Sequence, residues 1–352
     1  MAWSKLDRVM AALSGEKPDR TPIFDYMIND RVYEHYLGRP VVPEEKEAIL
    51  YACSQCLDLC HPMPVARAPC EEILPDGTRR LHERWMHWDI HPKRSEEEMF
   101  KALAAEVDEL ESGESRPSGE HVAAWKEDEA RKTAWAGNMA YISLGLSNPI
   151  LPGRNIVENA FYFADCPDLC RKWNKLKNQQ GLEWADAIST GCKTPVAIIW
   201  DDIAMKGGPI FSPELLDELY FPRLHDMVSM LHSKGIKTVF HSDGDVSPVF
   251  NRLADCGIDG FNPLEISAGM NVNQFVEQYG KKVSLVGGLD AVDVLAFGTP
   301  ASVTEATRQL IRDAGTKTGG RLIIGSSSGQ IDNSMPFENL IAYFNTVWET
   351  KI

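Results

Sequence analysis

The chain has 352 residues, of which 43% are hydrophobic and 25% are charged, and its formal net charge is −15. This composition is typical of a folded protein that buries a large core, and the length is ordinary for one large barrel. The acidic balance argues against nucleic acid as a main partner, because phosphate backbones are bound by clustered lysines and arginines.

The N-terminal stretch MAWSKLDRVMAALSGEKPDR lacks the charged-then-apolar pattern of a signal peptide. No apolar stretch approaches the ~20 residues that a membrane span requires. We therefore expect a cytoplasmic protein that does not enter a membrane.

Three of the eight cysteines lie close together in CSQCLDLC, at Cys53, Cys56 and Cys60. Thiolates at short spacing can hold zinc or an iron–sulfur cluster, but the same spacing fits one face of a helix that runs into a strand. No second pair follows at zinc-finger spacing, so we favour cysteines that pack as small apolar residues.

The first half of the chain is irregular. The expected elements are a helix at 4–16 and strands at 21–30, 56–65 and 140–150. Residues 70–135 are charged and aromatic, and we interpret them as hairpin and helical decoration with a flexible tip near 112–119.

The second half repeats one pattern. Apolar, β-branched runs predict strands at 194–203, 237–244, 259–265, 282–290 and 321–328. Ser212-Pro213, Ser247-Pro248 and Thr299-Pro300 are expected to begin the helices between them, because serine or threonine caps free N–H groups and proline has none to lose.

Strands that alternate with helices predict parallel βα units. No Gly-x-Gly-x-x-Gly stretch follows a strand, which disfavours a dinucleotide fold. We predict an α/β fold of the (βα)8 TIM-barrel type, formed as one domain over 1–352, with an N-terminal helical extension and decoration at about 70–135.

Polar residues gather late in the predicted strands, where such a barrel has its active-site face. His241 and Asp243 are two apart on one strand and therefore project to the same side, and Glu265 ends the next strand. Histidine with acids at one end of a barrel indicates either a divalent metal or acid–base catalysis. For the acids Asp201 and Asp290, capping of a turn is an equally good interpretation.

Several segments, in this order, resemble the uroporphyrinogen decarboxylase superfamily, and they cover nearly the whole chain except about 70–135. They are SKLDRVMAALSGEKPDRTPIF, IIWDDIAMKGGPIFSPELLDELYFPRLHDMV, FHSDGDV, GFNPLE, GGLDAVDVLAFGTPASV and GGRLIIGSSSGQIDNSMPFENLIAYF. The resemblance implies a (βα)8 barrel.

Within that superfamily, the decarboxylases carry an arginine-rich N-terminal signature. Here the corresponding stretch FDYMINDRVYEHYLG has only Arg31, and an acidic chain without that cluster would repel a polycarboxylate such as uroporphyrinogen. The sequence is more similar to the branch of corrinoid-dependent methyltransferases, in which zinc is held by His-x-Cys and a later cysteine. His241 is kept, Asp243 stands at the first cysteine position, and Ser328 lies close to the second.

This resemblance leaves two interpretations of the strand ends. Oxygen ligands replace sulfur in a zinc site of His241, Asp243 and Glu265, or there is no metal and the same acids act on substrate. Zinc would act as a Lewis acid on an ether or hydroxyl oxygen.

The leading hypothesis is a methyltransferase that moves a methyl group from a small O- or N-methylated compound, methoxyaromatic favoured, to a corrinoid protein, with zinc assisting. Catalysis and metal binding are assigned to His241, Asp243 and Glu265. The residues expected to line the substrate pocket are Asp25, Tyr26, Asn29, Trp200, Asp202 and Ser328.

Two other functions stay open. One is a decarboxylase-like lyase that acts on a smaller carboxylic acid, and the other is a protein that binds a tetrapyrrole or corrinoid without catalysis. A homodimer is also possible, with residues 70–135 as the interface.

Overall fold

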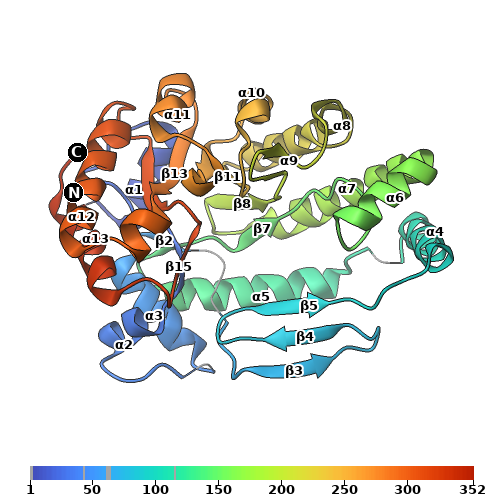
Figure 1. Ribbon diagram of the computed structural model, residues 1–352, viewed down its shortest axis with the longest axis horizontal. Coiled ribbons are helices and arrows are strands. Elements are labelled where there is room, and N and C mark those ends of the chain that lie inside the picture. Colours follow the sequence, from blue (N-terminus) through green and yellow to red (C-terminus); the bar gives the residue numbers. More distant parts are fainter. Residues whose placement is uncertain (1–2, 43, 61–64, 115) are drawn as a thin grey trace.

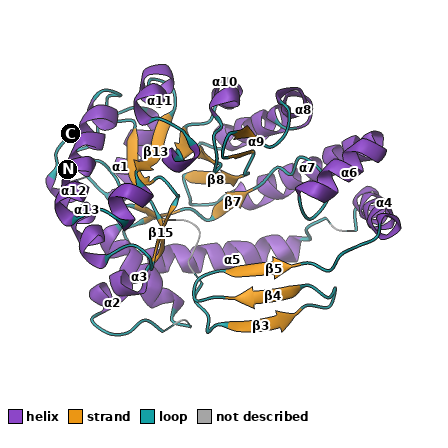
Figure 2. Ribbon diagram, viewed as in Figure 1, coloured by secondary structure: helices purple, strands orange, loops and turns teal. Residues whose placement is uncertain are grey.

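The computed structural model describes residues 3–42, 44–60, 65–114 and 116–352. Helices surround strands in a mixed α/β arrangement, and the largest sheet has six parallel strands in the order β14-β13-β12-β11-β8-β7 (Figures 1 and 2). These strands are β7 (Leu144–Leu146), β8 (Val196–Trp200), β11 (Lys237–His241), β12 (Gly260–Asn262), β13 (Ser284–Leu289) and β14 (Leu322–Ser326). The predicted α/β class with a parallel sheet is therefore confirmed.

Isolated β-bridges, each between one pair of residues, lie between the two edge strands of this sheet. Ile23 forms a parallel bridge to Ile324 of β14, and Phe24 forms one to Leu59. Leu59 belongs to β2 (Leu59–Cys60), which pairs in parallel with β6 (Ala140–Tyr141). The continuous ladder of the described residues thus ends at β7 and β14 and does not itself form a closed barrel.

A buried apolar cluster lies on the inner side of the strands. The helix α1 (Lys5–Ser14) contributes to it, and its first turn is fixed because Ser4 and Asp7 each accept a hydrogen bond from the other's backbone N–H. The members of the cluster are Val9, Ala12, Leu13, Phe24, Leu59, Ala140, Ile142, Val196, Ile198, Val239, Val286 and Ile323. A second, larger core fills the space between the strands and the outer helices.

The inner cluster fixes which strand residues point inward. Side chains alternate along a strand, so Trp200 follows Ile198 on the inner side of β8 and His241 follows Val239 on the inner side of β11. The two inward rows therefore end in polar or aromatic side chains at the carboxyl ends of neighbouring strands.

The helices lie outside the strands, and several begin where the sequence predicts. Ser212 caps α8 and Thr299 caps α12 in a capping box, as expected. After Ser247-Pro248 the chain instead forms a short 3-10 turn (Ser247–Val249) before α10. The helices after α1 are α2 (Asp30–Leu37), α3 (Lys46–Cys56), α4 (Glu96–Ser112), α5 (Gly119–Ala136), α6 (Ile156–Asp165), α7 (Pro167–Ser189), α8 (Pro213–Leu219), α9 (Phe221–Ser233), α10 (Phe250–Asp255), α11 (Val272–Tyr279), α12 (Pro300–Leu310) and α13 (Phe337–Glu349).

All three predicted strands of the first half are shorter than expected, and the one predicted at 140–150 divides into β6 and β7. Residues 21–30 divide into the bridging pair at 23 and 24 and β1 (Tyr26–Ile28), which pairs in parallel with β15 (Gln330–Asp332). Only Leu59 and Cys60 of the strand predicted at 56–65 are in strand conformation, and 61–64 lie outside the described residues.

The region 70–135 contains a small antiparallel sheet and two helices. The sheet has the order β3-β4-β5, with β3 (Cys70–Ile73), β4 (Arg79–His82) and β5 (His87–Ile90). It lies at the edge of the molecule (Figure 1). The predicted tip joins α4 to α5, and its residue 115 lies outside the described residues.

Short elements complete the description. The strands β9 (Ala204–Met205) and β10 (Gly208–Pro209) pair after β8, a 3-10 turn covers Ile266–Ala268, and π-helical turns cover Ala291–Ala296 and Ile311–Thr316. None of the described helices is long and apolar enough to span a membrane.

Candidate functional site

One group of side chains in the described residues has the spacing of a metal site. It consists of Asp202, His241 and Asp243, whose ligand atoms lie within 4.8 Å of one another. His241 ends β11 directly beside Trp200, the last residue of β8, and the two aspartates follow these strand ends. The parallel pairing of β8 and β11 is therefore what brings the three side chains together.

The imidazole of His241 is held from one side. Its Nδ1 lies 2.6 Å from Oδ1 of Asn262 at the end of β12, and the Asn262 amide donates a hydrogen bond to the carbonyl of Val286 at 2.8 Å. Because that donation leaves the oxygen of Asn262 facing the ring, we assign the proton to Nδ1. The neutral imidazole then presents the free lone pair of Nε2 to the two aspartates.

The two carboxylates lie opposite this nitrogen. Nε2 of His241 is 3.9 Å from Oδ1 of Asp202 and 3.9 Å from Oδ1 of Asp243. The backbone N–H of Asp243 donates to Oδ1 of Asp202 at 3.0 Å. Asp202 is thus positioned by the residue that supplies the other carboxylate.

Asp243 is held in an unfavourable electrostatic setting. Burial raises the pKa of its carboxyl group, the charges of Asp202 and Glu265 add to that rise, and His241 opposes it when its ring is protonated. Its Oδ1 is buried and has no hydrogen-bond partner among the described residues. A buried acceptor without a partner is costly, and a cation at this point would satisfy it.

Glu265 lies beside this group but is not part of it. Its Oε2 accepts a hydrogen bond from the Gly244 N–H at 2.7 Å, and its Oε1 accepts one from Ser267 at 2.6 Å. The structure therefore brings the predicted His241 and Asp243 together with Asp202, which the sequence assigned to the substrate pocket. Glu265 instead fixes the turn that follows Asp243.

Two further predicted residues lie at the same place. The rings of Trp200 and His241 have centroids 4.3 Å apart and are tilted by 54°. Ser328 donates to the carbonyl of Gln330 at 3.1 Å, and a Cβ placed on the adjacent Gly329 would lie 3.3 Å from Cε1 of His241. The loop after β14 therefore packs closely against the histidine, and Gly329 allows that approach.

The predicted pocket residues near the first strand have other contacts. Asp25 accepts a hydrogen bond from the Ser326 N–H at 2.9 Å, and burial raises the pKa of Asp25 to about 7. Asn29 caps α2, and its amide donates to the carbonyl of Asp332 at 2.7 Å. Burial also raises the pKa of Tyr26 to about 12. The described hydrogen bonds do not connect Asp25 or Asn29 with the group of Asp202, His241 and Asp243.

Asp201, the neighbour of Asp202, connects parts of the fold through hydrogen bonds. It is buried and accepts hydrogen bonds from Ser147 at 2.6 Å, from the Asn148 N–H at 3.0 Å and from Tyr220 at 2.8 Å. These contacts tie the loop after β7 and the start of α9 to the end of β8. Burial raises the pKa of Asp201 to about 6 despite these donors.

The three clustered cysteines do not form a metal site of this kind. Cys53, Cys56 and Cys60 are buried, and the pKa values of Cys56 and Cys60 are raised, chiefly by burial for Cys56 and by a hydrogen bond shared with Cys53 for Cys60. The raised pKa values favour the thiol forms of Cys56 and Cys60. The described residues therefore favour the interpretation that they pack as apolar side chains.

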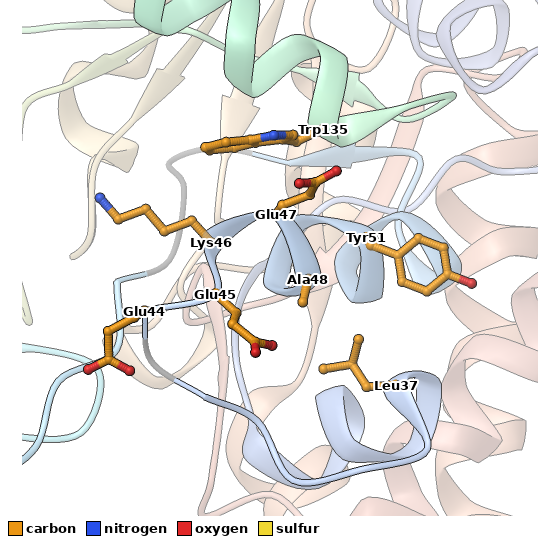
Figure 3. Close-up of a pocket in the computed structure, with 8 residues that line it drawn as sticks. All are labelled: Leu37, Glu44, Glu45, Lys46, Glu47, Ala48, Tyr51 and Trp135. Atoms are coloured by element: carbon orange, nitrogen blue, oxygen red, sulfur yellow. The ribbon is translucent and has the colours of Figure 1, made fainter.

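A hollow of about 620 Å³ lies elsewhere, between α2, α3 and the end of α5. Its lining residues are Leu37, Glu44, Glu45, Lys46, Glu47, Ala48, Tyr51 and Trp135. The charged ends of Glu44 and Lys46 and the hydroxyl of Tyr51 point in different directions (Figure 3). Because these polar groups do not converge on one point, the hollow does not have the arrangement of a catalytic or metal site.

The donor set at the strand ends fits zinc. One imidazole nitrogen and two carboxylates are ligands that Zn²⁺ accepts, and the lone pair of Nε2 and the unpartnered Oδ1 of Asp243 face the same point. No cysteine belongs to the group, as the sequence predicts from aspartate at 243.

The sequence interpretation did not select Asn262. Its signal is the strand register, because Asn262 pairs directly with His241 across β11 and β12. Register is not readable from the local pattern of GFNPLE alone.

Comparisons with known proteins agree with the fold. Residues 189–350, which include all three residues of the group, match the family described as uroporphyrinogen decarboxylase (URO-D). A stretch of 114 residues is 31% identical to a methylated-thiol–coenzyme M methyltransferase of Methanosarcina mazei, and this match covers 32% of the chain and 28% of the relative.

A solved structure, a methyltransferase from Methanosarcina mazei, covers 99% of both chains with a TM-score of 0.68 at 18% identity. This likeness concerns the fold alone, and it covers nearly the whole chain. Residues 189–350 are thus similar to the uroporphyrinogen decarboxylase family, and the whole chain shares its fold with the methyltransferase from Methanosarcina mazei.

Proposed function

We propose that the chain is a methyltransferase that takes a methyl group from a small O- or N-methylated compound, methoxyaromatic favoured, and delivers it to a corrinoid protein. The observation that carries this proposal is the convergence of His241, Asp202 and Asp243 at the ends of adjacent parallel strands. The names of the two methanogen proteins support transfer of a methyl group.

The residues that would hold zinc are Asp202, His241 and Asp243. Bound there, Zn²⁺ would supply Lewis acidity toward an ether or hydroxyl oxygen of the methyl donor. Asn262 orients the imidazole of His241 through Nδ1 so that Nε2 faces the two aspartates, the Asp243 N–H orients Asp202, and Trp200 packs against the imidazole. The chain's own contribution is therefore a preorganised set of ligands beside an aromatic wall.

The replacement of thiolates by carboxylates supports oxygen donors over thiols as substrates. Carboxylate and imidazole ligands form a harder site than cysteine ligands, and harder sites favour oxygen. Asp243 and Ser328 stand where the methyltransferase branch carries cysteine.

We also infer that the strands close into the (βα)8 barrel predicted from the sequence. The bridges Ile23–Ile324 and Phe24–Leu59 span the gap between the edges of the main sheet, and β2 pairs with β6. The inner apolar cluster draws residues from both parts of the chain. Closure would place the group on the face where barrels of this type carry their active sites.

The first test combines metal analysis with a transfer assay. We expect the purified protein to bind one zinc per chain, and His241→Ala to lose it. With zinc and a reduced corrinoid protein, methoxyaromatic or methylamine donors should methylate cobalt. A wild type that binds no zinc when supplied with it, and that methylates no cobalt from any of these donors, would contradict the proposal.

One observation favours a second function, a lyase that acts on a small carboxylic acid. Asp243 lies beside His241 and burial raises the pKa of its carboxyl group, a direction that suits a group that delivers a proton to the carbanion left by carbon dioxide. Release of carbon dioxide in the absence of any corrinoid protein would support this function over methyl transfer.

A further inference from the structure

The small sheet of β3, β4 and β5 exposes an apolar face. Opposite residues in an antiparallel pair share a face, so Glu71, Leu81 and Trp88 form one row and Ile73, Arg79 and Ile90 form the next. We call these six residues the apolar sheet face. Ile73 is 71% exposed, Trp88 56% and Ile90 47%.

The polarity of the sheet is reversed relative to an ordinary surface sheet. The other face carries Cys70, Glu72, Arg80, His82, His87 and Asp89, of which His82 is buried and Arg80 and Asp89 form an ion pair at 2.7 Å. Soluble antiparallel sheets usually turn apolar residues to the core and polar residues to water. Here three large apolar side chains, Ile73, Trp88 and Ile90, are exposed together on one face, as in a contact surface.

We propose that the apolar sheet face is the surface through which two copies of this chain associate. A large aromatic residue with β-branched neighbours is the type of anchor that dominates protein contacts. Contact between two identical faces about a two-fold axis is isologous, so each copy must complement itself.

The charges of this face suit a second copy. The chain carries a net charge of −15, so most of its surfaces repel another copy. The apolar sheet face is locally neutral, because its charged side chains are Glu71 and Arg79, which pair at 2.8 Å within the chain. In a two-fold arrangement Arg79 of one copy can face Glu71 of the other.

Sedimentation velocity on the full chain over a hundredfold concentration range tests the proposal. We expect a reversible dimer, and Trp88→Asp should raise its dissociation constant at least about tenfold. The control is Phe297→Asp, because Phe297 is 82% exposed at a different place and its replacement should leave the dimer intact. Thermal unfolding of each variant shows that it is folded.

A charge exchange gives a second test that does not depend on Trp88. Arg79→Glu and Glu71→Arg should each weaken self-association, because each makes the face carry two like charges. An equimolar mixture of the two variants should recover dimers, because each now meets its opposite charge.

A wild type that stays monomeric over the whole range overturns the proposal and leaves the face to a different protein. A dimer that Trp88→Asp and the charge variants do not weaken also overturns it, because the copies then meet through another surface.

Discussion

At the scale of single residues, the orientation of one asparagine decides what His241 can bind. The oxygen of Asn262 accepts a hydrogen bond from the N–H at Nδ1 of His241. In the neutral ring, the lone pair is then on Nε2. Substitution of Asn262 therefore tests the ligand role of His241 without replacing any proposed ligand.

Asn262→Leu should weaken zinc binding by about 10- to 100-fold, because the imidazole loses the acceptor that fixes its tautomer and angle. Asn262→Asp keeps an oxygen near Nδ1 and should bind zinc at close to the wild-type affinity. Competition titration against a chromophoric chelator measures both. Equal zinc affinity for the leucine variant and the wild type would remove Asn262 from the site.

Gly244 forms the corner after Asp243, and the structure shows why only glycine fits. Its φ is +84°, and a Cβ would lie 2.5 Å from the backbone of Ala204 and Met205. We expect Gly244→Ala to lower the free energy of unfolding by at least about 2 kcal/mol. The matched control is Gly207→Ala, where φ is +100° but nothing lies within 4 Å, and its cost should be only about 1 kcal/mol.

Denaturant unfolding of the two glycine variants separates the two causes. A larger loss at 244 than at 207 shows that the close approach matters in addition to the backbone conformation. Similar losses would mean that the turn can move away from Ala204, and that Asp243 is less firmly placed than its contacts indicate.

Much of the site was readable from the residues. His241 and Asp243 were predicted from their spacing on a strand that ends in polar residues, and the group at the strand ends contains both. The sequence analysis assigned Glu265 to the metal and Asp202 to the substrate pocket, whereas the group contains Asp202, because the turn at Gly244 uses the Glu265 carboxylate for its own hydrogen bond. A hydrogen bond from a backbone N–H cannot be predicted from a sequence pattern.

At the scale of elements, the second half of the chain was predicted more accurately than the first. Its strands are uninterrupted apolar runs, and Ser212 and Thr299 cap helices as expected. In the first half, the strands at the predicted positions have only two or three residues, as in β2 and β6. Short strands give too little periodicity to locate their ends.

The capping box at Thr299 offers a test at this scale. Its hydroxyl accepts from the Ser302 N–H, and Ser302 in turn accepts from the Thr299 N–H. Thr299→Ala should cost about 1 kcal/mol of stability, while Thr299→Ser, which keeps the hydroxyl, should cost much less. Urea unfolding measures both variants, and an equal cost for alanine and serine would show that the cap is dispensable for α12.

At the scale of the whole molecule, buried acids should make stability depend on pH. Burial raises the pKa of Asp25 to about 7, whereas an unfolded aspartate titrates near about 3.9. Between these values the folded protein keeps a proton that the unfolded chain has released. The free energy of unfolding therefore falls as pH rises through this window, and the stabilising contribution is complete below pH 4.

Asp25→Asn mimics the protonated acid at every pH and should remove this contribution to the slope. The difference in unfolding free energy between the two proteins should change by up to about 4 kcal/mol from pH 4 to above pH 7, with the variant gaining relative to the wild type as pH rises. Denaturant unfolding at several pH values measures the difference, with Asp165→Asn on the surface as the control. A difference that does not vary with pH would mean that Asp25 is ionised in the folded protein, and that the Ser326 N–H and the Tyr343 hydroxyl stabilise its charge enough to offset burial.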